Sequence, residues 1–475
     1  MRFDSFEFVV LYVIVFALYR VLPHRAQNGM LLAASYFFYG WWDWRFLSLL
    51  FASSVLDYAC GLMMHRYPIE QARRRRLWLC LSLAGNLGML GVFKYYGFFM
   101  DNLVAALGAV GIAIHPRTLN IVLPVGISFY TFQTMTYSID IYRGRLAPTR
   151  RFFDFMLYVS FFPQLVAGPI ERAGHLLPQI LQPRRVTWAG FTEGGWLIYW
   201  GLFKKMFIAD NAAHLTDRVF AAPQDFSAAM IWLATYAFAV QIYCDFSGYS
   251  DMARGLARQM GFDICRNFDH PYISTNPQEF WRRWHISLSE WLRDYLYIPL
   301  GGGRGSRGRV FFNLMATMTL GGLWHGAQWH FVFWGVFHGF LLIAYRLAAG
   351  EAGDRILGAS SRWRRAAAIA LFFHLTCLGW MLFRFEGQHL SDFLVLGGQL
   401  LGDWRVGPEF WREAARLAGF CLLGLGVDVA QYRMRDDLCV LRWPVWARTT
   451  LYLLMYLSLT LGGSYEARNF IYFQF

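Results

Sequence analysis

The chain has 475 residues, of which 56% are hydrophobic and only 16% charged, with 44 Phe, 25 Tyr and 20 Trp. An average soluble domain carries about 25% charged residues, so this composition excludes an ordinary soluble enzyme and predicts an integral membrane protein. The formal net charge is +13. Nucleic-acid binding is not expected in so apolar a chain, and most of the basic residues are assigned to topology and lipid headgroups.

The N-terminus predicts a retained first span rather than a signal peptide, because Asp4 and Glu7 precede its apolar run and no small-residue cleavage site follows. Apolar runs of about 17–25 residues, long enough to cross a bilayer, recur along nearly the whole length. No repeat period or long linker separates them, so one helical domain over residues 1–475 is predicted. The expected spans are residues 6–22, 29–45, 46–64, 77–93, 98–114, 119–140, 153–169, 187–208, 228–247, 310–323, 326–348, 366–384, 415–431 and 447–463.

The stretch from Gly29 to Met64 needs an internal break. As one helix its residues would extend about 54 Å, against a hydrocarbon core of about 30 Å. The sequence "WWDWR", from Trp41 to Arg45, is the expected interfacial turn, because Trp favours the headgroup level. The basic run from Arg73 to Arg76 predicts a cytoplasmic loop, which places the N-terminus outside.

A polar segment, "QIYCDFSGYSDMARGLARQMGF", begins at Gln241, directly after an apolar run. A lipid-facing helix could not carry Asp245, Ser247, Ser250 and Asp251 so close together, so we expect the segment to bend around a cavity or re-enter the membrane against protein. Polar contacts between helices are the alternative for each residue singly. Together with Tyr249, they predict a lined chamber.

The next segment predicts an interfacial helix. Asn276 before Pro277, with Glu279 soon after, is typical of a helix start. From Glu279 to Tyr297, charged and apolar residues alternate at roughly helical spacing, which favours a helix lying along the interface with one face buried. His285 would point inward from it, and Asn276 is a further candidate chamber residue.

The glycine-rich sequence "GGGRGSRGR" follows from Gly301. It has neither the GK[ST] of a P-loop nor the pattern of a Rossmann turn. Arg304 and Arg307, with Arg309, could still bind the phosphates of a cofactor through bidentate contacts. A plain basic turn in the cytoplasm is the alternative.

Three histidines, His325, His330 and His338, lie in the apolar run "LGGLWHGAQWHFVFWGVFHGF". Their spacing is not that of a zinc site, so no metal is expected; the seven cysteines likewise lack CxxC spacing. A transporter relay and hydrogen-bonded core histidines are the alternatives, and for His330 and His338 the core is favoured. His325 differs, because Gly321, Gly322 and Gly326 would open space for a substrate beside it, with Trp324 as a wall. An imidazole there could take a proton from an alcohol, which suits acyl transfer.

Long motifs also resemble a known family. They are "YCDFSGYSDMARGLARQMGF", "RNFDHPYISTNPQEFWRRWHISLSEWLRDYLYIPLGG", "LGGLWHGAQWHFVFWGVFHG", "LPVGISFYTFQTMTYSIDIYRG", "FFPQLVAGPIERA" and "WMLFRFE". The sequence is similar in these motifs to the membrane-bound O-acyltransferases, in the bacterial AlgI-like branch that serves alginate O-acetylation. The resemblance implies a ring of helices with re-entrant or interfacial helices around a central funnel or tunnel. It places the catalytic histidine on His325 and a second polar position on His285.

The resemblance further implies a multi-pass protein of the bacterial inner membrane that takes acetyl from cytoplasmic acetyl-CoA, with no resident cofactor, and passes it across the bilayer to a polysaccharide. His325 would be a general base or a transient acyl carrier, and His285 would orient or polarise the thioester carbonyl. Besides membrane lipid, the expected partner is a periplasmic or membrane-anchored serine acetyltransferase, because the chain has no Gly-x-Ser-x-Gly elbow. Peptidoglycan, cellulose or a teichoic acid are alternative acceptors, and a transporter or flippase is the alternative class.

Overall fold

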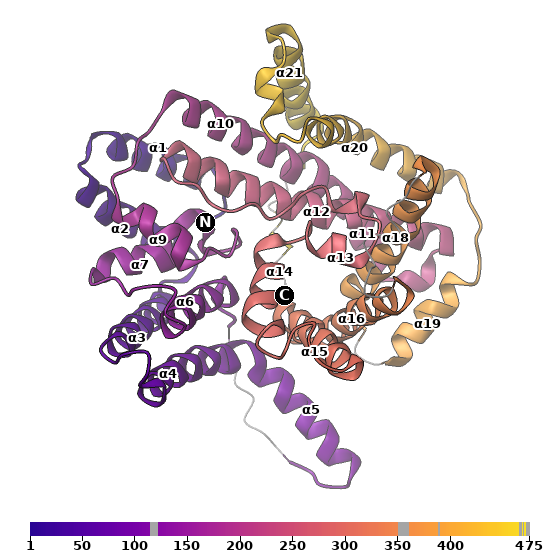
Figure 1. Cartoon of the computed structure of the whole chain (residues 1–475). Helices are drawn as coiled ribbons and strands as arrows, with labels where there is room; N and C mark the ends of the chain where they lie inside the picture. The colour runs from indigo at the N-terminus through magenta and orange to yellow at the C-terminus, as the bar shows by residue number, and fades with distance from the viewer. Residues whose placement is uncertain (115–121, 350–360, 388–389, 465–467, 469, 472–475) are drawn as a thin grey trace. The chain divides into compact units, whose positions relative to one another are not determined.

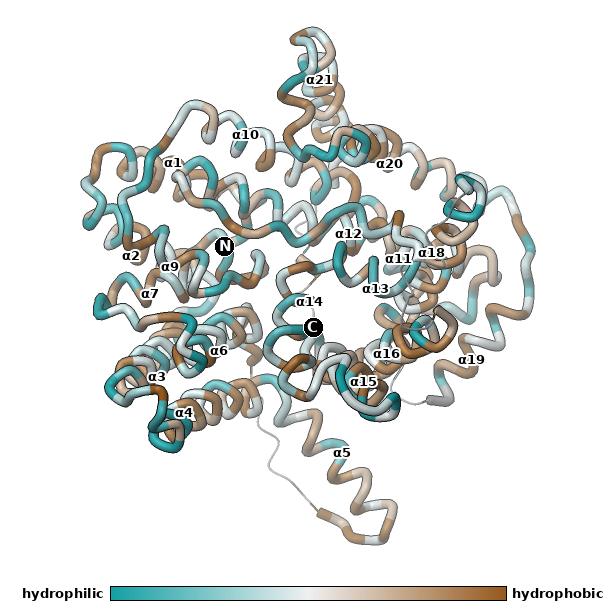
Figure 2. Tube along the Cα trace, in the orientation of Figure 1, coloured by the Kyte–Doolittle hydropathy of each residue, from teal (hydrophilic) through white to brown (hydrophobic). Residues whose placement is uncertain are grey.

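The computed structural model describes residues 1–114, 122–349, 361–387, 390–464, 468 and 470–471, and every regular element in these ranges is helical (Figure 1). Hydrophobic residues predominate along most of the long helices, with hydrophilic residues gathered near many helix ends (Figure 2). The chain is therefore an all-helical, multi-pass membrane protein, as its composition predicts. Among the residues that the structure describes, the helical stretches long and apolar enough to cross a membrane are His24–His65, Ala72–Ala109, Ala228–Gln259, Trp329–Ala349 and Arg362–Arg384.

The chain divides into two compact units, which are described separately. The first contains residues 1–195 and 252–265, and the second contains residues 196–251 and 266–475. The elements of the first unit are α1 Phe6–Val21, α2 His24–Asp43, η1 Trp44–Phe46, α3 Leu47–His65, α4 Ala72–Leu90, the π-helical turn η2 Gly91–Tyr95, α5 Tyr96–Ala109, α6 Ile127–Tyr142, α7 Phe152–Ser160, α8 Phe162–Leu165, α9 Ala173–Leu181 and the first part of α10 Trp188–Leu202.

The break predicted at the tryptophan-rich turn is confirmed. Helix α2 ends at Asp43, whose backbone is extended (φ −160°, ψ 110°), and α3 begins at Leu47 after one 3-10 turn. The Asp43 carboxylate accepts a hydrogen bond from the Arg45 backbone N–H, so it caps that turn.

The span predicted over residues 153–169 is wrong. Helix α7 has only 9 residues, about 13 Å at 1.5 Å per residue, which is too short to cross a bilayer. Phe161 leaves the helical region at ψ 109°, which ends α7, and Pro163 lies in the first turn of the next helix, α8, where proline is favoured. Most side chains of this apolar run are nevertheless buried, so they form part of the protein core.

The buried arginine of the basic run ties helix ends together in the first unit. Arg75 donates to the backbone carbonyls of Met64 at 3.2 Å and Tyr67 at 3.0 Å, at the end of α3. It also donates to the carbonyls of Ile141 at 2.6 Å and Tyr142 at 3.1 Å, at the end of α6. A guanidinium can satisfy several orphan carbonyls at once, so Arg75 has a structural role whatever the run does for topology.

The second unit holds all the residues predicted for the site. Its elements are the rest of α10, the π-helical turn η3 Phe203–Ala209, α11 Asp210–Ala221, η4 Pro223–Asp225, α12 Ala228–Gln259 up to Asp251, η5 Pro271–Ile273, α13 Pro277–Trp281, α14 Ile286–Leu292, the π-helical turn η6 Arg293–Tyr297, α15 Arg307–His325, α16 Trp329–Ala349, α18 Arg362–Arg384, α19 Leu390–Leu400, α20 Pro408–Met434, η7 Cys439–Arg442 and α21 Val445–Gly462.

The bend predicted after Gln241 is wrong, because α12 continues as one helix of 32 residues. A continuous helix can carry these polar groups because lysine side chains pair with its two aspartates. Asp245 pairs with Lys205 at 2.7 Å and Asp251 pairs with Lys204 at 2.6 Å. Buried charges are tolerated inside a membrane protein when they are paired in this way.

The continuous interfacial helix predicted from Glu279 to Tyr297 is also wrong. Helix α13 ends at Trp281, and α14 starts only at Ile286. Between them His285 has a left-handed backbone, φ 41° and ψ 56°, a conformation that interrupts an α-helix. The predicted start is confirmed, because Asn276 caps α13 by accepting a hydrogen bond from the Glu279 N–H at 2.8 Å.

Candidate functional site

His325 is the last residue of α15, and its imidazole is enclosed by aromatic side chains. The ring centroid lies 5.0 Å from that of Trp324, 5.0 Å from that of Trp334 on α16 and 5.5 Å from that of Phe383 on α18. Only 4% of the residue is exposed. A buried imidazole among aromatic walls is therefore held in one orientation and shielded from bulk water.

The prediction that the glycines around His325 open space for a substrate is wrong. A Cβ at Gly322 would overlap the Phe331 carbonyl of α16, and one at Gly326 would overlap the Phe331 ring. A Cβ at Gly321 would lie 3.1 Å from the Leu292 side chain. Gly322 and Gly326 instead let α15 and α16 approach closely, as small residues do between membrane helices, and Gly321 faces α14.

His285 comes from a different part of the second unit and is completely buried. It precedes α14, and the turn is fixed because the Ile286 N–H donates to the Asn267 carbonyl at 2.9 Å. The Ser287 hydroxyl donates to the Asn267 side-chain oxygen at 2.7 Å. The imidazole packs edge-on against Phe246 of α12, with ring centroids 4.6 Å apart. Its left-handed backbone is uncommon for a residue with a side chain, and such strain often occurs at functional positions.

The two histidines predicted to act together are neighbours. Their ring centroids are 6.5 Å apart, at an interplanar angle of 64°. The Trp324 ring flanks both, at 5.0 Å from His325 and 5.9 Å from His285. The centroid separation suits a small group held between the rings, within hydrogen-bond reach of each imidazole.

Two predicted chamber residues of α12 have structural partners elsewhere in the second unit. Asp245 is buried, pairs with Lys205, and accepts a hydrogen bond from the Ile471 backbone N–H at 2.7 Å. Tyr249 is buried and packs against Phe470, with ring centroids 4.9 Å apart. These contacts bring the two α12 side chains to the C-terminal segment of the chain.

Ser247, Ser250 and Asp251 do share a lined cavity, although it is small. Its volume is about 20 Å³, room for about one water molecule. The Ser247 hydroxyl accepts a hydrogen bond from the Lys204 ammonium at 3.0 Å, and Ser250 accepts one from the Asn267 amide at 3.1 Å.

Arg304 and Arg307, predicted to bind a cofactor, are exposed and lie together at the start of α15. That helix has 19 residues, so Arg307 and His325 are about 27 Å apart along its axis. The turn before the helix is held by Asn313, whose amide donates to the Gly302 carbonyl at 3.0 Å. The two arginines and the imidazole therefore occupy opposite ends of one rigid element.

His330 and His338 are buried, as predicted for core histidines. The hydrogen bonds expected for the two histidines are not found: among the described residues, no ring nitrogen of His330 or His338 has a hydrogen-bond partner. His338 is instead surrounded by aromatic rings, including Trp334 at 4.8 Å and Trp281 at 5.1 Å between centroids. Both side chains pack as aromatic groups in this part of the chain.

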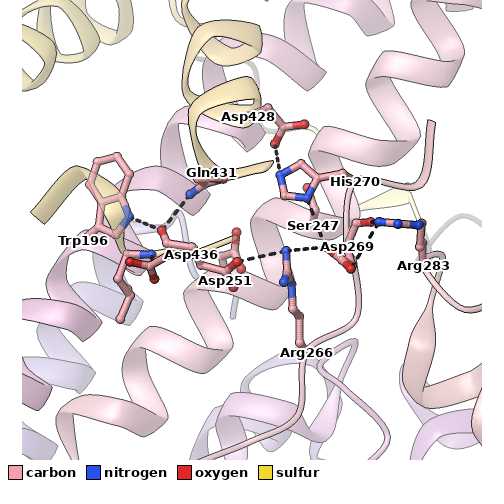
Figure 3. A network of polar contacts seen from close by, with 12 residues as sticks. Trp196, Ser247, Asp251, Arg266, Asp269, His270, Arg283, Asp428, Gln431 and Asp436 are labelled. Carbon is pink, nitrogen blue, oxygen red and sulfur yellow. Dashed lines mark hydrogen bonds and ion pairs between the residues drawn. The ribbon is translucent and has the colours of Figure 1, made fainter. Parts of the chain in front are cut away.

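A charged cluster around His270 was not predicted from the sequence. His270 lies between Asp269 and Asp428, while Arg266 and Arg283 each pair with Asp269 at 3.3 Å (Figure 3). The hydrogen bond with His270, together with the two guanidinium groups, lowers the pKa of Asp269 to about 2. His270 has a left-handed backbone (φ 48°). The position before Pro271 normally favours extended backbone, so no sequence rule would have found this conformation.

Comparisons with known proteins agree with the motif resemblance. A model of the membrane-bound O-acyltransferase family matches residues 145–350. The chain is 41% identical over 437 residues to the probable alginate O-acetylase AlgI of Azotobacter vinelandii, covering 92% of this chain and 85% of that protein. It is 38% identical over 359 residues to the peptidoglycan O-acetyltransferase of Helicobacter pylori, covering 69% of this chain and 67% of that protein.

A more distant relative is the teichoic acid D-alanyltransferase of Bacillus subtilis, which is 26% identical over 292 residues, or 58% of this chain and 72% of that protein. The level of identity to the alginate O-acetylase, over most of both proteins, confirms the family that the motifs indicated. The chain belongs to the membrane-bound O-acyltransferase family and is an O-acyltransferase.

Proposed function

We propose that this O-acyltransferase is the membrane component of a system that O-acetylates an exported polysaccharide, with His325 and His285 as its catalytic residues. The observation that carries the proposal is the buried pair of imidazoles, 6.5 Å apart between centroids, in a chain of this family. The relatives named for alginate and peptidoglycan O-acetylation support acetyl as the group transferred.

Acyl transfer between a thioester and a hydroxyl needs one proton transfer at each end of the reaction. As general base, His325 accepts the hydroxyl proton while the oxygen forms a bond to the acetyl carbon. The carbon–sulfur bond then breaks, and the proton passes to the departing thiolate. His285, as a neutral imidazole, donates a hydrogen bond to the carbonyl oxygen, where negative charge develops. In the alternative route His325 carries the acetyl group transiently and the hydroxyl attacks it.

The acyl donor in this proposal is cytoplasmic acetyl-CoA, and no resident cofactor takes part. Arg304 and Arg307 supply guanidinium groups suited to its phosphates. Their place at the start of α15, about 27 Å from His325, would let the helix receive the donor at one membrane face and deliver acetyl deeper in the protein.

A serine acetyltransferase in the periplasm or anchored to the membrane is the proposed partner. A bulky polymer is poorly matched to a narrow buried site, and the chain carries no Gly-x-Ser-x-Gly elbow that could supply a second nucleophile. In this arrangement the chain hands acetyl to the partner's serine, and the partner modifies the polymer.

The experiment reconstitutes the purified chain in lipid nanodiscs with radiolabelled acetyl-CoA, the polymer and the partner expressed from the same operon. Acetylation of the polymer should require both proteins, and His325→Ala in the chain should abolish it. Efficient polymer acetylation by this chain alone would refute the relay. Offering alginate, peptidoglycan, cellulose and a teichoic acid with a D-alanyl carrier protein in parallel identifies the acceptor and the acyl group. Transport of an intact glycan without acetyl transfer would favour a transporter.

The proposed orientation in the bacterial inner membrane can be tested through the basic run. Arg74→Cys, in a cysteine-free background, should resist an impermeant thiol reagent in intact cells and react after permeabilisation. Arg74 is exposed, whereas Arg75 holds helix ends and should not be replaced. Labelling of intact cells would reverse the proposed topology.

A further inference from the structure

Two cavities of opposite character meet at His270 in the second unit. One has a volume of about 220 Å³ and is lined mainly by apolar side chains of η3, α12 and α20. The other has a volume of about 480 Å³ and is lined by arginines and aspartates from the segments on either side of α13, the start of α18 and the end of α20. His270 and Tyr432 line both cavities, so the two adjoin at these residues. Neither lining includes His285 or His325.

The larger cavity, which we call the arginine cavity, contains more positive than negative charge. Five arginines and three aspartates line it. These charged residues are Arg266, Arg283, Arg365, Arg433, Arg435, Asp269, Asp436 and Asp437. Arg266 forms an ion pair with Asp437 at 3.0 Å. It also pairs with Asp269 at 3.3 Å, and Asp269 pairs with Arg283 as well (Figure 3). The third carboxylate, Asp436, pairs with Arg442 at 3.3 Å.

Three arginines of this cavity remain uncompensated. Arg365, Arg433 and Arg435 have no ion-pair partner among the described residues, and Arg365 donates only to the Tyr432 hydroxyl, at 2.9 Å. Arg433 and Arg435 stand at the C-terminal end of α20. Guanidinium groups that converge on one cavity without carboxylate partners are suited to an anion with several oxygens, such as a phosphodiester.

The smaller, apolar cavity opens along the side of α20. Leu425 and Val429 line it and are 60% and 40% exposed. Leu422, one turn earlier on the same helix, is 73% exposed, so this side of α20 presents an apolar surface suited to contact with lipid. A chain entering from the bilayer would therefore reach this cavity without crossing protein.

We propose that the two cavities together bind one anionic glycerophospholipid of the surrounding bilayer. Its phosphodiester lies against Arg365, Arg433 and Arg435, and one acyl chain lies along Leu425 and Val429. His270 and Tyr432 separate the polar and apolar halves of the ligand. Asp428, beside His270 at 3.9 Å, lies toward the apolar half and away from the phosphate.

The combination of cavities favours a lipid over a soluble phosphate compound. A free phosphate or a nucleotide would use the arginine cavity only and would leave the apolar cavity exposed. A lipid fills both, with its charged headgroup against the arginines and its acyl chain against the apolar wall. The site is independent of the acyltransferase reaction proposed above, since no lining residue belongs to the histidine pair.

The first test measures binding of a fluorescent short-chain phosphatidylglycerol to the full chain purified in detergent. Replacing three arginines near an anionic headgroup should weaken binding about 100-fold, at roughly fivefold each. The variant is Arg365→Gln/Arg433→Gln/Arg435→Gln. The control is Arg412→Gln/Arg416→Gln, which removes exposed arginines near the other end of α20. Equal affinity of the triple variant and the wild type would overturn the proposal.

Competition distinguishes the sources of phosphate. Unlabelled phosphatidylglycerol should displace the probe, whereas phosphatidylcholine, inorganic phosphate and acetyl-CoA should not at matched concentration. Displacement by acetyl-CoA would assign the arginine cavity to the acyl donor, and displacement by phosphatidylcholine would make the site an unselective lipid surface. Either result would overturn the proposal.

A second variant tests the apolar half without touching charge. Val429→Trp should fill the apolar cavity and weaken the probe at least tenfold, whereas Leu422→Trp, on the lipid-facing side of the same helix, should not. Both variants keep every arginine, so a loss confined to Val429→Trp supports an acyl chain in this cavity. Undiminished binding by a folded Val429→Trp protein would contradict it.

Discussion

His285 and His325 lie with their ring centroids 6.5 Å apart, although one precedes α14 and the other ends α15. Trp324 flanks both rings, and Phe246 and Trp334 close the opposite sides. The positions of the two imidazoles therefore depend on contacts with several helices of the second unit, including α12 and α16. Their relative position should be sensitive both to the turn at His285 and to the packing of α15 on α16.

Replacing His285 should damage catalysis rather than folding. His285→Phe keeps an aromatic ring in the contact with Phe246 but removes the hydrogen-bond donor proposed for the carbonyl oxygen. Loss of such a donor typically lowers kcat about 10²–10³-fold. His338→Phe is the matched control, since its ring nitrogens have no hydrogen-bond partner among the described residues. The single-turnover rate of acetyl transfer is measured for both variants. An equal fall in rate for His285→Phe and His338→Phe would contradict a specific catalytic role for His285.

Gly322→Ala should disturb His325 indirectly. The added Cβ would overlap the Phe331 carbonyl and come within 3.0 Å of the Gly335 Cα, so α15 and α16 must separate. Overpacking of this kind costs about 1–3 kcal/mol. Gly308→Ala, in the same helix and with no atom within 4 Å of the new Cβ, should be harmless. Unfolding midpoints in detergent and transfer rates test this, and an unaffected Gly322→Ala protein would refute the close-packing role.

The buried pair of Lys205 and Asp245 should contribute mainly to stability. Lys205 contacts Asp245 and Asp210, each at 2.7 Å, and all three are nearly inaccessible. Lys205→Met leaves two buried carboxylates without their cation, which typically costs about 3–5 kcal/mol. Arg405→Gln, which breaks an ion pair whose arginine side chain is 89% exposed, should leave the unfolding temperature nearly unchanged. Thermal unfolding of both variants is the measurement. A stable Lys205→Met protein with altered substrate affinity would instead support substrate binding by Asp245.

The cluster at Asp269 predicts a particular pH dependence. The hydrogen bond with His270 and the nearby arginines hold the pKa of Asp269 at about 2, below its ordinary value. The ionised carboxylate therefore stabilises the fold fully above about pH 4, and this contribution is lost as the pH falls toward 2. The unfolding midpoint of the wild type should exceed that of Asp269→Asn by a constant amount from pH 7 to 5. The difference should shrink below pH 4, and a difference that grew on acidification would contradict the assignment.

Apolar run length and turn chemistry predicted the helical class, the break at Asp43 and the cap at Asn276, because these depend on local sequence. The continuity of α12 could not be predicted, since the lysines that neutralise Asp245 and Asp251 come from another helix. The left-handed turns at His270 and His285 were missed for a similar reason. Neither residue is a glycine, and tertiary contacts hold their backbones.

The histidine pair was predicted through family resemblance together with local chemistry, and the structure adds the proximity of the two rings. Local reasoning on the glycines was wrong, because it treated a missing side chain as free volume. The neighbouring helix occupies that volume. The arginine cavity gave no sequence signal, since its side chains come from α18, the end of α20 and the residues after it, and the segments on either side of α13.

The central claim is that His325 performs the acyl transfer. The most direct measurement is the single-turnover rate of radiolabelled acetyl transfer from acetyl-CoA to the partner's serine, in nanodiscs, for the wild type, His325→Ala and His214→Ala. His214 is an exposed histidine of the same unit and serves as the control. We predict that His325→Ala lowers the rate about 10²–10⁴-fold, with unchanged membrane abundance and wild-type activity in the control. Transfer by a folded His325→Ala protein at the wild-type rate would contradict the assignment.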